Sequence, residues 1–390
     1  MTPIGAHSFL GLCVFGIIAL FLITYGLKVA YGAVRLPWLR DCAPVPNENC
    51  PTISVIFAAR DEQEKLPAAL ATLVAIDYPR LEIVAVDDRS SDRTAQILDD
   101  FASLHPQLKV VHLRELPKGW LGKPHALQKG FDTSTGELIV FTDADVKFQR
   151  DSLRRAVTLL RERALDHLTL LGDVERSGFW DTVLITFFGM GFQLSVDPYN
   201  VSNPNSRSYV GVGAFQMLRR SAYEASGTHR RLAMEVIDDM KLGKIVKLAG
   251  LRSGVAVAQN YVSVAWHLGL GNLARGVEKN FFAGAQFQVP VAIAQILSLL
   301  LMNVLPFAGL FFGHGWIRAL AAISVLVSVC FHLGVDIVMG VSPLYGLTLP
   351  LGAVLLAYMV LRSTVVTLRQ GGIVWRDTFY PLEDLRRGLV

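Results

Sequence analysis

Charge is distributed very unevenly along this chain, and that distribution limits the folds open to it. Residues 1–27 contain no Lys, Arg, Asp or Glu, and residues 289–361 contain only two such side chains, Arg318 and Asp336. The region between them has ordinary globular composition, rich in all four charged residue types. A run of about 20 apolar residues is long enough to cross a bilayer. The pattern therefore predicts a membrane segment, a water-soluble domain and a second membrane region, in that order.

We expect four parts along the chain. They are a transmembrane signal anchor at 1–40, a domain at 50–285, a bundle of about three transmembrane helices at 286–365 and a basic tail at 366–390. Positive charge follows the first span and none precedes it. By the positive-inside rule this places the domain in the cytoplasm and the chain in the inner membrane as a multi-pass protein. Three spans after the domain would leave the basic tail outside, whereas its charge favours the cytoplasm, so both topologies stay open.

The domain shows alternating strand and helix patterns. Apolar, β-prone runs occur at 53–59, 81–86, 108–113 and 137–141, and helical patterns lie between them, including one at 123–132. Strands that alternate with helices imply right-handed βαβ units and a parallel sheet. We therefore expect an α/β domain, similar to a Rossmann sheet.

Two acids, Asp143 and Asp145, directly follow the strand at 137–141. Ligands of open α/β sheets bind at the carboxyl ends of the strands. Two carboxylates there suit Mg²⁺ or Mn²⁺, which keep coordination positions open for substrate phosphates. The alternative is a solvated turn, because Asp-x-Asp is common in turns. The surrounding motifs have to decide between the two.

Five motifs in order resemble those of the family 2 inverting glycosyltransferases. They are Ala59–Glu62, Val86–Thr94, Gly119–Lys123, Asp143–Asp145 and Asp238–Gly243. The resemblance covers about residues 50–290. It implies the GT-A fold, a nucleotide-sugar donor, expected to be UDP-linked, and a divalent cation. Within the family, one N-terminal span and a C-terminal membrane bundle are similar to ceramide glucosyltransferases and to hopanoid- and carotenoid-associated glycosyltransferases.

The resemblance also assigns roles to single residues. Asp145 is the expected principal metal ligand, and Asp143 is expected to contact both the metal and the donor. Asp239 is the expected general base, with Asp238 beside it. The remaining expected donor-binding residues of these motifs are Asp61, Glu62, Asp87, Asp88 and Lys123.

Some of these positions have plainer alternatives. Asp61 stands where relatives commonly have Asn, and both Asp61 and Glu62 fit equally well as caps of the helix that follows. Lys123 precedes a helix, so its ammonium and nearby backbone N–H groups suit phosphate. Asp238 and Asp239 also fit as acids at a helix N-terminus.

Polymerising relatives carry a Gln-x-x-Arg-Trp motif after the base. The corresponding region here, residues 275–280, contains no Trp, which argues against processive polysaccharide synthesis. Arg275 and Lys279 are the expected pyrophosphate-binding residues in its place. Trp266 and His267 lie just upstream, as interfacial residues or as part of the site.

The apolar segment Phe179–Val196 is short for a span. It fits either a helix in the membrane interface that admits a lipid acceptor or a buried core helix. The net charge is +4 without a basic cluster, so no nucleic-acid partner is expected.

The sequence thus predicts a membrane enzyme that moves one sugar from a nucleotide sugar to a lipid acceptor. One alternative is a polyprenyl-phosphate sugar transferase. Another, outside the enzymes, is a membrane transport or scaffold protein whose domain only binds nucleotides.

Overall fold

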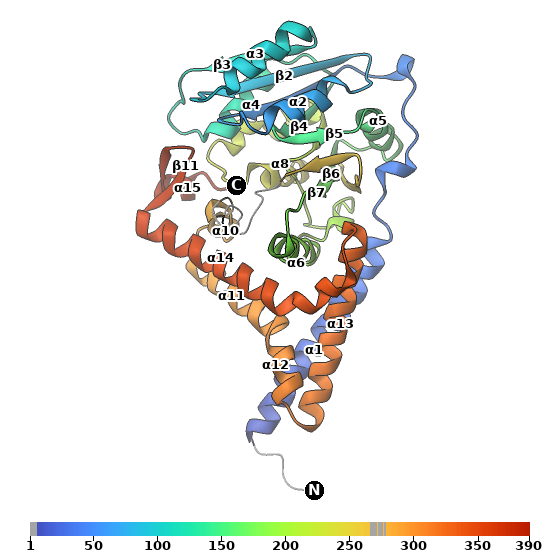
Figure 1. Ribbon diagram of the computed structural model, residues 1–390, viewed down its shortest axis with the longest axis vertical. Coiled ribbons are helices and arrows are strands. Elements are labelled where there is room, and N and C mark those ends of the chain that lie inside the picture. Colours follow the sequence, from blue (N-terminus) through green and yellow to red (C-terminus); the bar gives the residue numbers. More distant parts are fainter. Residues whose placement is uncertain (1–5, 266–270, 272–275, 277) are drawn as a thin grey trace. The chain divides into compact units, whose positions relative to one another are not determined.

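The computed structural model describes residues 6–265, 271, 276 and 278–390 (Figure 1). The chain forms two compact units, and each consists of three separate stretches of sequence. The sheet unit comprises Leu36–Glu175, Pro198–Trp266 and Gly372–Val390. The helical unit comprises Met1–Arg35, Arg176–Asp197 and His267–Gly371.

A seven-stranded sheet in the order β3-β2-β1-β4-β8-β6-β9 forms the centre of the sheet unit. The first four strands pair in parallel, as the alternating pattern predicts. β8 runs antiparallel to both of its neighbours, so the complete sheet is mixed. The strands are β1 (Ile53–Ala59), β2 (Leu81–Asp88), β3 (Leu108–Leu113), β4 (Leu138–Asp143), β6 (His167–Leu171), β8 (Gln216–Arg219) and β9 (Ser253–Val257).

Apolar residues on both faces of the sheet explain why these segments are strands. Nearly every residue of β1 is buried, as in sheets covered by helices on both sides. One core cluster contains side chains of α2, α3 and α5, and a second contains side chains of α4, α7 and α8. These helices are α2 (Leu66–Val74), α3 (Thr94–Leu104), α4 (Gly122–Thr133), α5 (Ser152–Glu162), α7 (Arg220–Ser226) and α8 (Asp238–Leu248).

Smaller elements complete the sheet unit. A three-stranded sheet has the order β5-β10-β7. After the helical unit the chain returns as the hairpin β11–β12 and the short helix α15. These elements are β5 (Val146–Phe148), β7 (Asp173–Val174), β10 (Val262–Val264), β11 (Gly372–Trp375), β12 (Thr378–Pro381), α15 (Leu382–Arg387) and the 3-10 helices η1 (Leu39–Asp41), η2 (Asn47–Asn49), η3 (Pro198–Asn200) and η4 (His229–Leu232). Most of the region expected as a basic tail is therefore folded.

Five described helical segments are long and apolar enough to cross a membrane. They are Phe9–Ala33, Phe179–Asn200, Val289–Phe312, Gly315–Met339 and Pro343–Gln370. The helices involved are α1 (Ala6–Ala33), α6 (Phe179–Val196), α11 (Val289–Asn303), α12 (Leu305–Phe312), α13 (Gly315–Met339), η5 (Pro343–Thr348) and α14 (Leu349–Gln370), with α10 (Glu278–Gly284) packed on α14. Pro306 lies in the first turn of α12, directly after the break at Val304.

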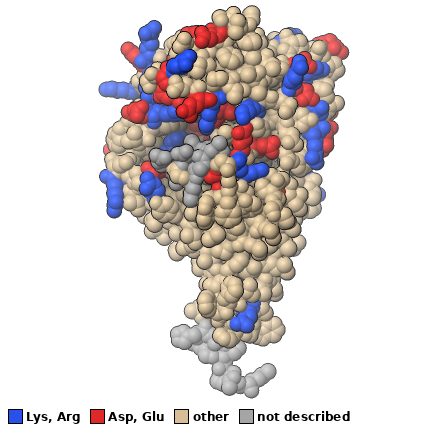
Figure 2. All heavy atoms as spheres, viewed as in Figure 1, with Lys and Arg blue, Asp and Glu red and all other residues tan. Residues whose placement is uncertain are grey.

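The helical unit contains few polar contacts in its interior. His332 and Asp336 lie one turn apart on α13, and His332 Nδ1 is 3.0 Å from Asp336 Oδ2. Gly352 lets α14 approach the ring of Phe187 on α6, since a Cβ there would lie 2.7 Å from that side chain. Figure 2 shows almost no charge over the visible face of this unit, whereas Lys, Arg, Asp and Glu gather over the sheet unit.

Candidate active site

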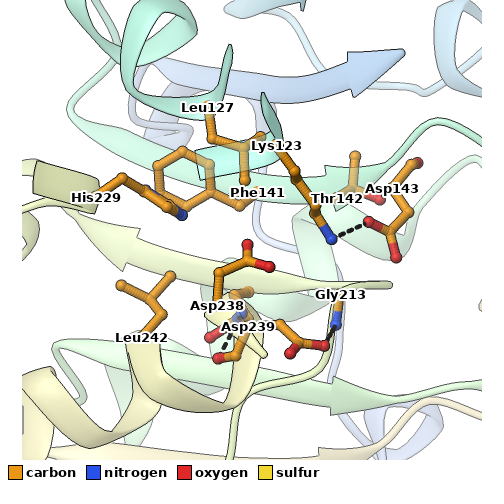
Figure 3. Close-up of a pocket in the computed structure, with 11 residues that line it drawn as sticks. Lys123, Leu127, Phe141, Thr142, Asp143, Gly213, His229, Asp238, Asp239 and Leu242 are labelled. Carbon is orange, nitrogen blue, oxygen red and sulfur yellow. Dashed lines mark hydrogen bonds and ion pairs between the residues drawn. The ribbon is translucent and has the colours of Figure 1, made fainter. Parts of the chain in front are cut away.

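The expected catalytic residues meet in a cavity of about 230 Å³ in the sheet unit. Figure 3 shows Lys123 and Asp143 facing Asp238 and Asp239 across this space. The strands end later than the sequence pattern indicates, so Asp87, Asp88 and Asp143 are the last residues of β2 and β4. The cavity is lined by Lys123, Leu127, Phe141, Thr142, Asp143, Gly213, Gln216, His229, Asp238, Asp239 and Leu242.

Lys123 lies in the first turn of α4 and forms an ion pair with Asp143. Its Nζ atom is 2.6 Å from Asp143 Oδ1. Burial works to lower the pKa of Lys123, but the charges of Asp143, Asp238 and Asp239 outweigh it and raise the pKa above its usual value. The lysine is therefore a fixed positive charge among three acids.

Asp239, at the start of α8, is held in one orientation by backbone groups. Its Oδ2 accepts the N–H of Gly213 at 3.0 Å, and its Oδ1 accepts the N–H of Met240 at 2.8 Å. A carboxylate has about four acceptor positions, so two such bonds leave it able to take a proton from a ligand. Asp238 is buried beside it.

Two glycines in the loop before β8 permit this arrangement. A Cβ at Gly213 would lie 2.4 Å from Asp143 Oδ2, and a Cβ at Gly211 would lie 1.8 Å from the carbonyl oxygen of Asp239. Any side chain at either position would collide with an acid or its backbone. Sequence reasoning missed these glycines. The Gly-Val-Gly sequence at 211–213 is the signal by which they could have been found.

Two buried histidines belong to the cavity surroundings, and sequence reasoning missed both: His229 lines the cavity, and His167 contacts the lining residue Gln216. His229 Nδ1 is 2.5 Å from the Tyr223 hydroxyl, and burial together with the charge of Lys123 lowers the pKa of His229 to about 3. His167 Nε2 is 3.1 Å from Gln216 Oε1, and the Gln216 amide donates to the carbonyl of Asp239. Burial lowers the pKa of His167 to about 4. Both histidines are therefore neutral at physiological pH.

Asp145 lies two residues beyond Asp143 and binds a second lysine. Lys65 Nζ is 2.9 Å from Asp145 Oδ2 and also donates to the carbonyl of Ala265 at 2.9 Å. No group of three or more His, Cys, Asp or Glu that could hold a metal ion occurs among the described residues. The protein donors here are thus two carboxylates. This set fits Mg²⁺ or Mn²⁺ completed by water and substrate phosphates, and it fits a closed protein cage poorly.

The first motif residues, Asp61 and Glu62, have different partners. Asp61 has a φ of 54° and accepts the backbone N–H of Ser91 at 2.7 Å, so it joins the two neighbouring strand-end loops. The Glu62 carboxylate pairs with the guanidinium of Arg376, in the β11–β12 turn. Burial raises the pKa of Glu62, while the charge of Arg376 opposes that rise. Neither acid is the simple helix cap that sequence reasoning offered as the alternative, since neither side chain caps α2.

The adjacent acids at the end of β2 are both buried. Asp87 Oδ1 accepts the backbone N–H of Ser90 at 3.1 Å, and Asp87 Oδ2 is 3.1 Å from His112 Nδ1. Asp88 forms a two-point contact with the guanidinium of Arg89 at 2.8 and 3.1 Å. A Cβ at Gly122 would lie 2.4 Å from Asp88 Oδ2, so Asp88 packs directly under the start of α4.

The expected pyrophosphate-binding residues are Arg275 and Lys279. Lys279 lies on α10 and belongs to the helical unit. Arg275, Trp266 and His267 lie outside the described residues. Their expected roles stay predictions.

The sheet order and the acids at its strand ends define the GT-A class of fold. Among solved structures, the chain resembles the mannosyltransferase PcManGT from Pyrobaculum calidifontis, determined in complex with GDP-Man and Mn²⁺. The TM-score is 0.54 and the sequence identity 20%, and the match covers 92% of this chain and 99% of the mannosyltransferase. This likeness supports the fold.

Residues 54–227 match the family model described as "Glycosyl transferase family 2". The chain is 29% identical to the beta-monoglucosyldiacylglycerol synthase of Synechocystis sp., over 56% of this chain and 44% of the synthase. It is 24% identical to the 4,4'-diaponeurosporenoate glycosyltransferase of Staphylococcus haemolyticus, over 67% of this chain and 70% of that enzyme. The chain thus spans less than half of the Synechocystis relative. Residues 54–227 are a family 2 glycosyltransferase domain.

Proposed function

We propose that this protein is a glycosyltransferase that moves a single sugar from a nucleotide-sugar donor to a lipid in the membrane. The observation that carries the proposal is the cavity in which Asp239, oriented by two backbone N–H groups, faces the Lys123–Asp143 pair. The Synechocystis relative is named for a lipid product, beta-monoglucosyldiacylglycerol, and the Staphylococcus relative is named for 4,4'-diaponeurosporenoate. The five apolar helical segments give this chain the means to meet a lipid acceptor.

The donor is expected at the carboxyl ends of β1, β2 and β4. Asp87 and Asp88 supply carboxylates for the base and ribose of a uridine nucleotide, since a carboxylate accepts the imide N–H of uracil. Asp143 and Asp145 would hold Mg²⁺ or Mn²⁺, which would neutralise charge on the departing diphosphate. Lys123 adds a fixed positive charge beside them, and it would stabilise the same negative charge without needing a proton.

Asp239 acts in this proposal as the general base. Its carboxylate takes the proton of the acceptor hydroxyl, and the acceptor oxygen forms a bond to the anomeric carbon. The bond from that carbon to the diphosphate oxygen breaks, and the nucleoside diphosphate leaves with the bonding electrons. Gly213 and Met240 hold the base in place during this step, so no rearrangement of Asp239 is needed.

The proposed location is the inner membrane, with the sheet unit in the cytoplasm, where nucleotide sugars are made. The basic residues Arg35 and Arg40 follow the first apolar segment, which supports this orientation. Segment 275–280 contains no Trp, which supports transfer of one sugar rather than polymerisation.

The test is transfer by the full-length protein in liposomes made from a bacterial lipid extract, with UDP-sugars and Mn²⁺, read by mass spectrometry of the lipids. Asp239→Asn should keep UDP binding but lose transfer by about 10²–10⁴-fold, the usual contribution of a general base. Asp100→Asn, an exposed acid on α3, is the matched control and should leave transfer unchanged.

Three outcomes would contradict the proposal in different ways. Near wild-type transfer by Asp239→Asn would remove this residue as the base and make Asp238 the next candidate. A product in which the sugar is joined through a phosphate would identify a polyprenyl-phosphate acceptor. UDP binding by the wild type without any transfer would favour a protein that only binds nucleotides.

A further inference from the structure

The β11–β12 hairpin contacts three separate donor-side motifs of the sheet unit. Its turn residue Arg376 pairs with Glu62 after β1. Its strand residue Tyr380 is buried and lies near Gly122, at the start of α4, and near Asp88 and Arg89, all of which act on the Tyr380 pKa. Gly122 in turn packs on Asp88 at the end of β2. A segment that follows the last apolar helix therefore lies against the loops that follow β1 and β2.

The conformation of the turn aims Arg376 at this place. Arg376 and Asp377 both have positive φ values, 49° and 63°. Two such residues between paired strands form a type I′ turn, which usually contains Asn and Gly. Non-glycine residues adopt this conformation only where the surroundings stabilise it, and such strain concentrates at functional sites. The buried residues Ile373 and Leu385 anchor the hairpin on both sides of the turn.

Stability does not explain the Arg376–Glu62 pair. The Arg376 side chain is 42% exposed, and ion pairs this exposed to solvent add little to stability. That gain is smaller than the cost of two left-handed residues. The half-exposed guanidinium of Arg376 lies beside a strand-end loop. It can release the carboxylate of Glu62 and bind another anion instead.

The surroundings of Arg376 indicate which anion that is. Glu62 lies near Lys65 and Asp145 as well as Arg376, since all three charges act on the Glu62 pKa. Lys65 and Lys123, like Arg376, are each paired with an acid at this edge of the sheet. The carboxyl edge of an open α/β sheet is where such folds bind their ligands, and the proposed ligand here is a nucleotide sugar with a diphosphate. Arg is suited to this exchange because its planar fork binds phosphate oxygens at two points.

We propose that Arg376 is a donor-binding residue that leaves Glu62 and binds the diphosphate of the nucleotide sugar. The inference rests on the proposed function of this site and adds a residue from outside residues 54–227, which match the family model. Tyr380 holds the hairpin against the start of α4, and the turn conformation presents Arg376 at the strand-end loops. The hairpin is then one wall of the donor site.

The experiment measures binding of UDP and of uridine to the full-length protein in detergent with Mn²⁺, by titration calorimetry. Arg376→Ala should weaken UDP binding about tenfold, the effect of losing one charge-assisted hydrogen-bonding group. Uridine binding should stay unchanged, because uridine has no phosphate. Arg376→Lys should recover part of the UDP affinity, and KM for the donor should rise while KM for the lipid acceptor stays constant.

Arg387→Ala is the matched control, since Arg387 is an exposed arginine of the same segment that pairs only with Glu383 and Asp384 in the structure as described. It removes one positive charge and should leave UDP binding unchanged. Thermal unfolding of each variant checks the fold, and Arg376→Gln keeps the side-chain length if Arg376→Ala is unstable.

Equal UDP affinity in Arg376→Ala and wild type would overturn the inference while leaving the proposed function intact. Equal losses for uridine and UDP would also overturn it, because the hairpin would then shape the nucleoside pocket instead of binding phosphate. A wild-type protein that binds no UDP under these conditions would overturn both the inference and the proposed function.

Discussion

Two acid–base pairs, one in each unit, differ in how solvent reaches them. In the sheet unit the Lys123 side chain is 24% exposed and its partner Asp143 is 38% exposed. In the helical unit His332 is 1% exposed and Asp336 is not exposed at all. The first pair borders a cavity, and the second is sealed among helices.

This difference separates pairs that can exchange partners from pairs that cannot. A ligand that enters the cavity can replace Lys123 at Asp143 without unfolding the domain. The His332–Asp336 pair has no such access, because both side chains are buried on α13. His332 Nε2, Asp336 Oδ1 and Ser328 Oγ are buried without a hydrogen-bond partner among the described residues.

The largest expected effect comes from the exchangeable pairs. Asp145→Asn should lower transfer about 10³-fold, because Lewis-acid stabilisation by a metal is worth several kcal/mol and each 1.36 kcal/mol is a factor of ten. UDP affinity measured in Mn²⁺ should fall to the value that the wild type shows in EDTA. Full transfer by the wild type in excess EDTA would contradict the metal-binding role of Asp145.

A smaller effect is expected from the buried neutral histidines of the sheet unit. His167 and His229 have folded pKa values of about 4 and about 3, below the ordinary 6.5. The unfolded chain therefore binds protons first, and stability that is present above pH 6.5 is lost as the pH falls towards 4. Within this window, each histidine should lower the free energy of unfolding by about 1.4 kcal/mol for each pH unit that the pH falls.

Thermal unfolding between pH 6.5 and 4.5 tests this expectation. His167→Gln should flatten the pH dependence by the share of one group, since glutamine does not titrate. The contribution of His112 to stability has the opposite pH dependence, because the neighbouring Asp87 and Asp99 raise the His112 pKa despite partial burial. Its contribution is complete below pH 6.5 and is lost only as the pH rises. An unchanged slope in His167→Gln would contradict the assignment.

The smallest effect is expected in the sealed pair. Asp336→Leu leaves His332, one turn away on the same helix, without its carboxylate, and a single hydrogen bond contributes about 1 kcal/mol to stability. Thermal unfolding in detergent should show a small loss of stability, while UDP affinity stays at the wild-type value. Ile337→Leu, on the exposed side of α13, is the control. A fall in UDP affinity in Asp336→Leu would contradict this expectation, because it would show that the buried pair is coupled to UDP binding.

Much of the fold could be predicted from sequence because local patterns determine it. The parallel strands β1, β2 and β4 are mostly buried on both faces, so their apolar runs stand out, and the acids at or after their ends mark the carboxyl edge. β8 could not be predicted, because Gln216–Arg219 is short and carries polar residues. The helix α6 was identified as an apolar segment, but its assignment to the helical unit depends on contacts distant in sequence.

The site was predictable to the same extent. Asp143, Asp238, Asp239 and Lys123 line one cavity, as the motif order indicates. Gly213 and Gln216 matter because they contact Asp239 in the folded chain. No local sequence pattern predicts these contacts. Arg376 lies more than 300 residues after Glu62 in sequence, as their separation of 314 shows. Only the folded chain brings such residues together.

The interleaving of the two units has a consequence for biosynthesis. The sheet unit is interrupted at Arg176–Asp197 and again at His267–Gly371, and its hairpin is made after the last apolar helix. The β11–β12 hairpin is therefore synthesised only after all the apolar helices. The proposed donor site cannot be completed before then. A fragment cut at 36–266 would retain the apolar helix α6 and lack the segment that contacts Glu62 and Gly122. We therefore expect soluble expression of the sheet unit to require a graft of residues 372–390 and a replacement for residues 176–197, whereas simple truncation would yield aggregates.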